Sequence, residues 1–162
     1  PRELPDAQPD GERILNWTQV YDLAELPEEL IVVGSGVTGA EFAGAYQALG
    51  SKVTLVSSRD RVLPGEDPDA AAVLEDVFRR RGMNVMARSR AESAKRVGDR
   101  VEVTLADGRV ISGSHCLMAV GASPTARAWA WRRRASGSAS PVTSGPTRCP
   151  ARPPPASTRP VT

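Results

Sequence analysis

The sequence predicts an α/β fold with three layers, in which a parallel sheet is combined with an antiparallel three-strand β-meander. Two observations favour this fold. Between residues 30 and 86, short apolar runs alternate with two helix-length segments, the pattern of β-α-β units whose parallel strands are buried on both faces. Between residues 94 and 112, three runs alternate apolar and polar residues and are separated by tight-turn residues, as in antiparallel hairpins.

The first part of the pattern supplies the parallel strands and their helices. In chain order we expect a strand at 30–33, a helix at 38–49, a strand at 52–57, a helix at 68–81 and a strand at 83–86. Gly50 and Gly82 stand where a helix commonly ends in a left-handed residue. The second helix is expected to have one apolar face, formed by Val73, Leu74, Val77 and Phe78.

The meander and the chain's beginning complete the prediction. The meander strands are expected at 94–97, 101–105 and 109–112, and an apolar strand follows at 114–120. Residues 1–13 contain three prolines and indicate an irregular connection. Residues 14–23 predict a short helix or turn, because Trp17, Val20 and Leu23 stand at helical spacing.

Residues 125–162 differ in composition from everything before them. They hold seven of the 14 prolines, seven arginines, and no Leu, Ile, Asp, Glu or Lys. Such a segment cannot bury enough apolar surface to offset its ordering entropy, so we expect a disordered basic tail. All 19 acidic residues therefore lie in residues 1–124, which makes that part mildly acidic although the chain's formal net charge is +2.

The bulk composition excludes several classes of protein. No apolar run reaches the length of a membrane-spanning helix, so no membrane partner is expected. Cys116 and Cys149 lie far apart, which argues against a disulfide scaffold, a zinc site or a redox dithiol and favours the reducing cytoplasm. Cys116 and its neighbour His115 fall in an apolar strand, where packing is the simplest role. The start at Pro1, without methionine or signal peptide, indicates a fragment of a larger coding sequence.

A glycine motif stands between the first parallel strand and the first helix. Gly34, Gly36 and Gly39 follow the spacing GxGxxG, the fingerprint of a dinucleotide-binding Rossmann unit when a strand precedes it and a helix follows. The first glycine permits a sharp turn, the second lets backbone approach a pyrophosphate, and the third permits close packing. Free N–H groups at the helix start and the helix dipole favour phosphates. The predicted pyrophosphate-binding residues are therefore Gly34, Ser35, Gly36, Val37, Thr38 and Gly39; the alternative is a tight βα turn without a ligand.

The end of the second strand bears on the choice between NADH and NADPH. An NAD site usually places a carboxylate there, bonded to the ribose 2′-hydroxyl, but Ser57, Ser58 and Arg59 occupy this position, with Arg61 just beyond. A carboxylate would repel a 2′-phosphate by up to about 4 kcal/mol at about 4 Å in an effective dielectric of about 20. Serine hydroxyls and Arg59 would instead bind the phosphate through charge-assisted hydrogen bonds. The sequence thus favours NADP over NAD; in the alternative, both arginines are ordinary solvated loop charges.

Several segments together resemble one known family. They are Leu26-Pro27, the run from Val33 to Glu41, Arg61-Val62-Leu63-Pro64, the meander, and Val120-Gly121-Ala122-Ser123-Pro124. The family is that of the pyridine nucleotide-disulfide oxidoreductases, FAD enzymes that include lipoamide dehydrogenase, mercuric reductase and quinone-reducing relatives. The resemblance implies a segment leading out of an FAD domain (residues 1–26), an NAD(P)-binding domain (27–124) and a non-native tail (125–162).

The resemblance also implies a function and roles for particular residues. Family members pass hydride from NAD(P)H to FAD and then electrons to a disulfide, a metal or a quinone; this chain is most similar to the lipoamide-dehydrogenase-like quinone reductases. The residue matching Glu41 lies near the nicotinamide, those matching Ser57–Arg59 meet the adenosine ribose, and the glycine matching Gly121 lies near the cofactor. From its position in the sequence alone, Glu41 is expected in the first turn of the helix, where the helix dipole stabilises any acidic residue. We expect an NAD(P)H-binding fragment, inactive alone, of a homodimeric FAD-dependent oxidoreductase with a quinone or disulfide acceptor.

The chain departs from the family pattern in two ways. The family's first GxGxxG for FAD, its CxxxxC redox pair, its FAD-binding Gly-Asp motif and its dimerisation domain do not occur in this sequence. After Pro124 the family continues into a Gly- and Leu-rich helix, whereas this chain continues into Trp and Arg. We interpret the tail as read out of frame, because GC-rich codons for residues 126–135 and 154–162 can encode that helix and that FAD motif at one shared offset. The sequence of the coding DNA decides this.

Two other functions fit parts of the sequence. A stand-alone nucleotide-binding regulatory module without catalysis would need the same glycine motif. The run Arg132-Arg133-Arg134 beside Trp129 and Trp131 is a pattern seen in nucleic-acid-binding segments. We expect no nucleic-acid partner, because a tail read out of frame carries no selected function.

Overall fold

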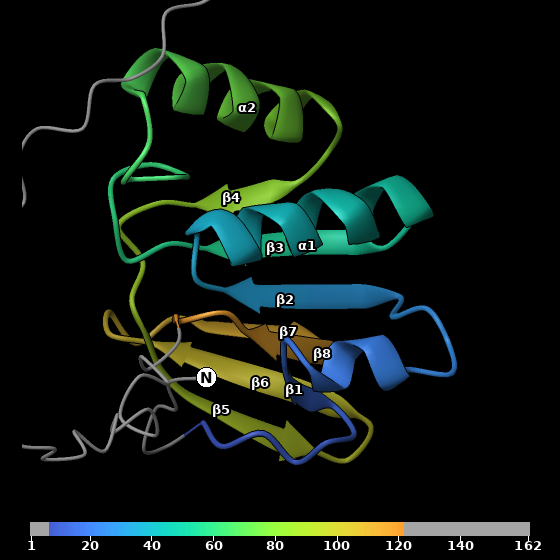
Figure 1. The fold of residues 1–162 in the computed structure, drawn as a ribbon. Coiled ribbons are helices and arrows are strands. Elements are labelled where there is room, and N and C mark those ends of the chain that lie inside the picture. Colours follow the sequence, from blue (N-terminus) through green and yellow to red (C-terminus); the bar gives the residue numbers. More distant parts are fainter. Residues whose placement is uncertain (1–6, 122–162) are drawn as a thin grey trace, which may run out of the picture. The chain divides into compact units, whose positions relative to one another are not determined.

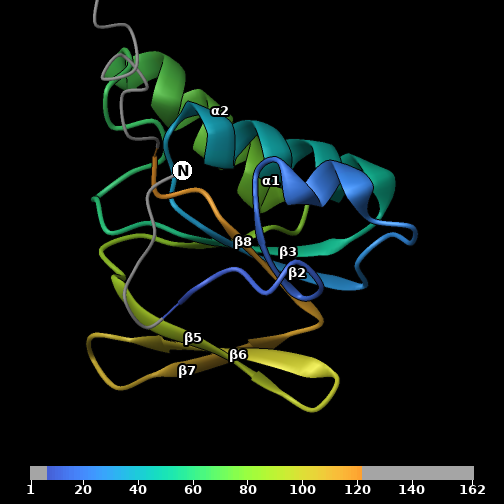
Figure 2. The same cartoon turned by 60° about the horizontal axis from the view of Figure 1, so that its bottom comes forward.

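The computed structural model describes residues 7–121, which form three layers. A five-stranded sheet lies between helices on one face and a three-stranded sheet on the other (Figure 1, Figure 2). In chain order the elements are β1 (Ile14–Asn16), η1 (Gln19–Asp22), β2 (Glu29–Val33), α1 (Val37–Leu49), β3 (Lys52–Val56), α2 (Pro68–Arg80), β4 (Asn84–Met86), β5 (Ala91–Val97), β6 (Arg100–Leu105), β7 (Val110–Gly113) and β8 (His115–Met118). The predicted α/β fold is confirmed, whereas the predicted disordered tail lies outside the described residues.

The central sheet is parallel throughout, with strand order β1-β8-β2-β3-β4. The chain proceeds from β2 to β3 and β4 on one side, while β8 and β1 lie on the other side of β2. The strand order therefore reverses between β2 and β8. In open α/β sheets, ligands bind outside the carboxyl ends of the strands at such a reversal. This places the expected site where β2 ends and the glycine motif begins.

The central strand β2 is buried on both faces, as its continuous apolar run predicts. Leu30 and Val32 belong to the core on the helix side, which includes Ala40 and Ala43 of α1. Ile31 and Val33 belong to the core between the sheet and the meander. Each fully buried aliphatic side chain contributes about 1.5–3 kcal/mol relative to exposure. The strand and the start of α1 are thus held on a rigid scaffold.

The helix ends agree with the capping residues in the sequence. Gly50 has φ of 107° and donates its N–H to the carbonyl oxygen of Gln47 at 3.1 Å. Asp67 caps α2 by accepting from the N–H groups of Asp69 and Ala70 at 2.9 and 3.1 Å. The predicted apolar face of α2 is wrong at Val73, which is 63% exposed. The buried stripe instead follows the side chains of Ala71, Leu74 and Phe78, which repeat at helical spacing.

The predicted helix or turn over residues 14–23 is wrong in its first part. Ile14–Asn16 form strand β1, which pairs with β8, and only Gln19–Asp22 form a short 3-10 helix. Ile14 is buried toward the meander and Leu15 toward the helices, so pairing with a distant strand overrides the local helical spacing. These residues pack in the same unit as residues 27–121, although the sequence assigns them to the preceding segment.

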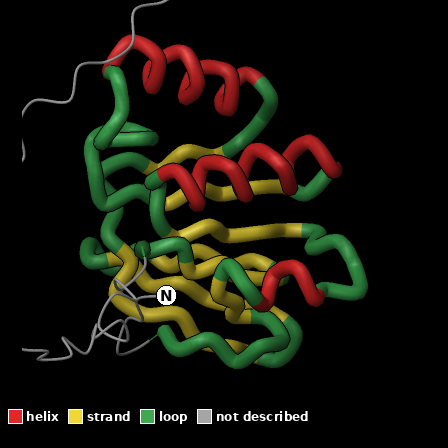
Figure 3. The backbone as a smooth tube through the Cα atoms, viewed as in Figure 1, coloured by secondary structure: helices red, strands yellow, loops and turns green. Residues whose placement is uncertain are grey.

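The meander is confirmed, with β5 antiparallel to β6 and β6 antiparallel to β7 (Figure 3). Its turns use Gly98 and Gly108, whose φ angles are 60° and 84°. Its first strand begins at Ala91, three residues before the predicted start at Ala94. Because residues 87–90 fill the short connection from β4 to β5, they lie where the carboxyl end of the parallel sheet meets the meander (Figure 1). Within residues 7–121, the helices are too short or too polar to cross a bilayer.

Candidate functional site

The first and third glycines of the motif are required by packing within the turn. Gly34 has φ of 114°, and a Cβ atom there would lie 2.3 Å from the carbonyl oxygen of Ala119. A Cβ atom on Gly39 would lie 1.8 Å from the carbonyl oxygen of Gly34. The end of β2, the start of α1 and the residue after β8 therefore approach one another more closely than any side chain allows.

Gly36 has a different environment, because a Cβ atom there would meet nothing within 4 Å. Its φ of −69° and ψ of −176° are accessible to any residue, so neither packing nor backbone strain requires a glycine. It is the N-cap of α1 and provides no side-chain cap. The first helical hydrogen bond runs from the N–H of Ala40 to the Gly36 carbonyl oxygen at 2.9 Å. The N–H groups of residues 37–39 therefore precede the helical ladder, and residues 36–38 are exposed, which is the arrangement that binds anions.

A cleft of about 570 Å³ extends from the glycine turn along the carboxyl edge of the sheet. Its volume is in the range of small-molecule sites. Among residues 7–121, no Asp or Glu lines it, and Arg59 and Arg90 are its charged lining residues. The full lining is Val33, Gly34, Val56, Ser58, Arg59, Ser89, Arg90, Ala91 and Val120. The cleft is therefore electrostatically suited to an anionic ligand.

Two buried serines join the glycine turn to the end of β3. The hydroxyl oxygens of Ser35 and Ser57 lie 2.6 Å apart, and Ser57 is fully buried. Ser57 also donates toward the carbonyl oxygens of Arg59 and Arg61 at 3.2 and 3.3 Å. The predicted contact between the Ser57 side chain and the ribose needs an exposed hydroxyl, whereas in this geometry the Ser57 hydroxyl is buried. Ser57 instead holds the loop that carries Ser58 into the cleft.

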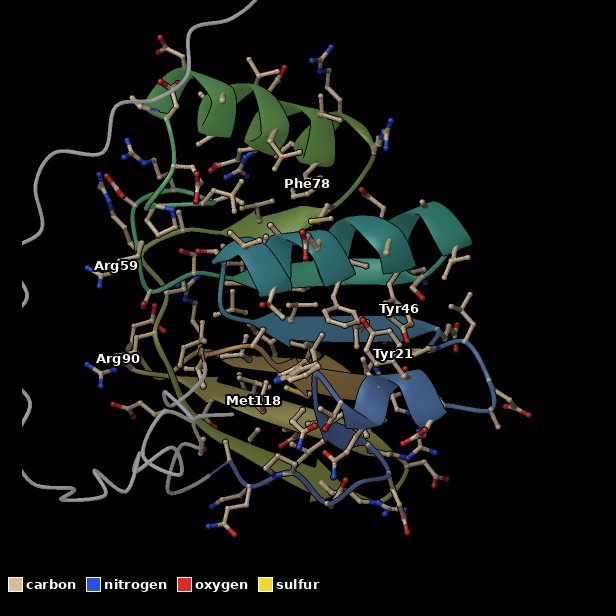
Figure 4. All side chains as sticks on the ribbon, in the orientation of Figure 1. Tyr21, Tyr46, Arg59, Phe78, Arg90 and Met118 are labelled. Atoms are coloured by element: carbon tan, nitrogen blue, oxygen red, sulfur yellow. The ribbon has the colours of Figure 1, made fainter. Side chains whose placement is uncertain are left out.

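Arg59 lines the cleft, whereas Arg61 does not. Arg59 is exposed and lines the cleft, and Figure 4 shows its side chain at the same end of the sheet as that of Arg90. Arg61 is half-buried, and its Nε atom has no hydrogen-bond partner among the described residues. The carbonyl of Arg61 accepts from the serine hydroxyls instead. Only the first of these two arginines is available to a ligand in the cleft.

Sequence reasoning missed Ser89, Arg90 and Val120 as cleft residues. The first two follow β4, which is the parallel neighbour of β3, so their approach to the β3 end depends on strand order. A signal was present, since Arg88-Ser89-Arg90 follows the short apolar strand at 83–86 after a single alanine. Val120 follows β8 and precedes Gly121, which has φ of 96° and is exposed.

Glu41 lies elsewhere than expected from its position in the motif. Helix α1 begins at Val37 and has no acidic residue in its first turn, so the prediction of a first-turn acid is wrong. Glu41 is exposed and lines a separate groove of about 540 Å³ between α1 and α2, together with Val37 and Phe78. Residues of the motif thus line two separate hollows: Gly34 lines the cleft, whereas Val37 and Glu41 line this groove.

The remaining reactive side chains are structural in this fold. Cys116 is fully buried between β1 and β2, and burial raises the pKa of its thiol to about 12. Burial, with a smaller effect from Arg13, lowers the pKa of His115, whose Nδ1 lies 3.1 Å from the Ser114 hydroxyl. Among residues 7–121, no cluster of three acidic, His or Cys side chains is arranged to hold a metal ion. Cys149 and the arginines at 132–134 lie outside the described residues.

Comparison with known proteins finds relatives whose names agree in the kind of enzyme they describe. An NAD(P)H dehydrogenase (quinone) of Mycobacterium tuberculosis is 60% identical over 124 residues, covering 76% of this chain and 25% of that protein. A dihydrolipoyl dehydrogenase of Bacillus subtilis is 42% identical over 90 residues, covering 56% of this chain and 20% of that protein. The crystal structure of LpdA from Mycobacterium tuberculosis superimposes with a TM-score of 0.74 at 59% identity, covering 77% of this chain and 27% of that one.

The chain spans a quarter of the length of the first relative and a fifth of the length of the second. An HOCl-induced flavoprotein disulfide reductase, RclA from Escherichia coli, shares the fold with a TM-score of 0.66 at 27% identity, covering 75% of this chain and 27% of that one. The sequence profile of the pyridine nucleotide-disulphide oxidoreductases matches residues 3–137. With the glycine turn, the profile match and these relatives in agreement, the chain belongs to the pyridine nucleotide-disulphide oxidoreductase family.

Proposed function

We propose that this chain is the NAD(P)H-binding part of an FAD-dependent oxidoreductase that passes hydride from NAD(P)H to FAD and then electrons to a quinone or disulfide. The observation that carries the proposal is the open space at Gly36, beside the N–H groups that begin α1. A glycine that neither packing nor backbone strain requires is explained by a ligand that approaches the backbone. The names of the relatives support the class of reaction.

In this proposal the dinucleotide lies along the carboxyl edge of the sheet. Its pyrophosphate binds at residues 36–39, where the helix dipole and the free N–H groups favour negative charge. The adenosine ribose lies toward Ser58 and Arg59, and the nicotinamide toward Glu41, as the family resemblance implies. Gly121 follows the cleft residue Val120 and lies at the same edge. When bound, the nicotinamide supplies hydride to FAD, and this chain's residues position it.

The other parts of the proposal concern the parent protein. The FAD site, the acceptor and a homodimeric assembly are assigned to the parent, and cytoplasmic location is proposed for it. The residues of this chain bind and orient the nucleotide, and none is proposed to exchange a proton or electron itself. The chain alone should therefore bind nucleotide weakly and show no turnover.

NADPH is the proposed cofactor, because the part of the cleft formed by residues 7–121 has arginine and no carboxylate. Replacing Arg59 by alanine should weaken NADPH binding by about tenfold, the loss of one charge-assisted hydrogen bond, while NADH binding changes little. Calorimetric titration of the 162-residue chain with each nucleotide measures both constants. Arg81→Ala is the matched control, because Arg81 is exposed at the opposite end of β4. Equal losses for the two nucleotides would contradict the NADPH assignment.

The complete gene product distinguishes the oxidoreductase from a regulatory module. Purified parent protein should retain flavin colour and oxidise NADPH in the presence of a quinone. Nucleotide binding without bound flavin would instead support a regulatory module and overturn the proposed reaction.

A further inference from the structure

We propose that Arg90 is a second specificity-determining residue, which forms with Arg59 a two-sided clamp for the ribose 2′-phosphate of NADPH. The inference rests on the proposed nucleotide function and deepens it. The two arginines come from different strand ends, since Arg59 follows β3 and Arg90 follows β4. Both line the cleft that begins at the glycine turn, and Figure 4 shows both side chains at that end of the sheet.

Both side chains are available to a ligand. Arg59 and Arg90 are exposed, and neither forms an ion pair or side-chain hydrogen bond within residues 7–121. Most other described arginines are engaged, for example Arg80 with Asp76 and Arg109 with Asp107. Arg59 and Arg90 thus face the cleft without a protein partner, and within residues 7–121 no Asp or Glu lines that cleft.

The backbone fixes the two arginines relative to each other. The Arg88 N–H donates to the Arg59 carbonyl at 2.7 Å, and the Ser89 N–H donates to the Ser57 carbonyl at 2.7 Å. On the far side, the Ala106 N–H donates to the Arg90 carbonyl at 2.8 Å. Arg90 is therefore tied both to the loop of Arg59 and to the meander. Such preorganisation reduces the entropic cost of binding.

The charge of the clamp matches the group that distinguishes NADPH from NADH. A phosphate monoester carries close to two negative charges near neutral pH, and guanidinium groups bind phosphate oxygens through paired N–H donors. Ser58, which is exposed and also lines the cleft, adds a hydroxyl. A free 2′-hydroxyl, as in NADH, offers no charge to either arginine. The second arginine therefore contributes selectivity as well as affinity.

The test compares two small probes that differ only in the 2′-phosphate, adenosine 2′,5′-bisphosphate and 5′-AMP. Arg90→Gln should weaken binding of the bisphosphate by about tenfold and leave binding of 5′-AMP nearly unchanged. Arg90→Lys, which keeps the charge but loses the paired donors, should lose less. Arg81→Gln, an exposed arginine at the other end of the sheet, should change neither. Amide NMR titration measures weak binding and shows in the same spectra that each variant is folded.

The outcomes separate this proposal from the one on which it rests. If both probes bind the wild-type chain and Arg90→Gln weakens both equally or neither, the clamp is wrong and nucleotide binding stands. If neither NADPH nor NADH perturbs the spectrum of the folded wild-type chain, the nucleotide function fails, and the clamp with it. A selective loss of bisphosphate binding in Arg90→Gln supports both.

Discussion

Replacing Gly36 by aspartate will abolish dinucleotide binding in a chain that folds as well as the wild type. The added Cβ atom meets no protein atom within 4 Å, and the backbone is already extended, so the fold accepts it. Aspartate is a good N-cap and accepts from the first N–H groups of α1, which leaves stability equal or a few tenths of a kcal/mol higher. The same groups are the proposed pyrophosphate donors, and the carboxylate repels the phosphates. We expect a loss in NADPH affinity of at least about 100-fold.

Gly36→Asn is the matched control for the charge. Asparagine has nearly the same shape and also caps the helix, but it carries no charge. It should weaken NADPH binding less than aspartate does, since only the steric block and the competition for N–H groups remain. Urea unfolding and nucleotide titration of both variants measure the two effects separately. If Gly36→Asp retains wild-type NADPH affinity, the phosphates do not bind at this turn.

Gly39→Ala will have the opposite effect and strongly destabilise the fold. Its Cβ atom would lie 1.8 Å from the Gly34 carbonyl oxygen and 2.8 Å from the Gly34 carbonyl carbon, so backbone would have to move. Overpacking against movable side chains typically costs about 1–3 kcal/mol, and we expect at least about 3 kcal/mol here because the obstacle is main chain. Urea unfolding monitored by circular dichroism measures the loss in the free energy of unfolding.

Gly44→Ala tests the same substitution in the same helix. Its Cβ atom would approach only the edge of the Phe78 ring, at 3.2 Å. The gain in helix propensity of about 1 kcal/mol opposes this mild contact, so the free energy of unfolding should change by no more than about 1 kcal/mol. If Gly39→Ala is as mild as Gly44→Ala, the close approach of α1 to the glycine turn is wrong.

Local features of the sequence predicted most of the fold and the turn. The apolar run of β2, the glycine at position 50 that ends α1, and the spacing of Gly34 and Gly39 depend on neighbours within a few residues. Strand β1 was not predictable in this way, because Ile14 and Leu15 become a strand only by pairing with β8, about 100 residues later. The spacing of apolar residues within a short segment contains no information about such a distant partner strand.

The candidate site likewise contains residues that neighbours in the sequence predict and residues that only the strand order brings together. Arg59 was predictable from its place at the end of β3, whereas Arg90 belongs to the cleft only because β4 lies beside β3. Ser57 shows the limit within a single strand end, since its neighbour Ser58 points into the cleft while its own hydroxyl is buried against Ser35. The identity of a residue at a strand end predicts which ligand groups it could bind. The direction of its side chain depends on how the neighbouring strands and loops pack around it.

Titration of the isotopically labelled wild-type chain with NADPH tests the central claim most directly. The claim is that the N–H groups at the start of α1 bind the dinucleotide phosphates. Amide resonances of Val37, Thr38 and Gly39 should shift and saturate together with those of Ser58 and Arg59. Saturable NADPH binding that leaves the amides of residues 37–39 unchanged would contradict it.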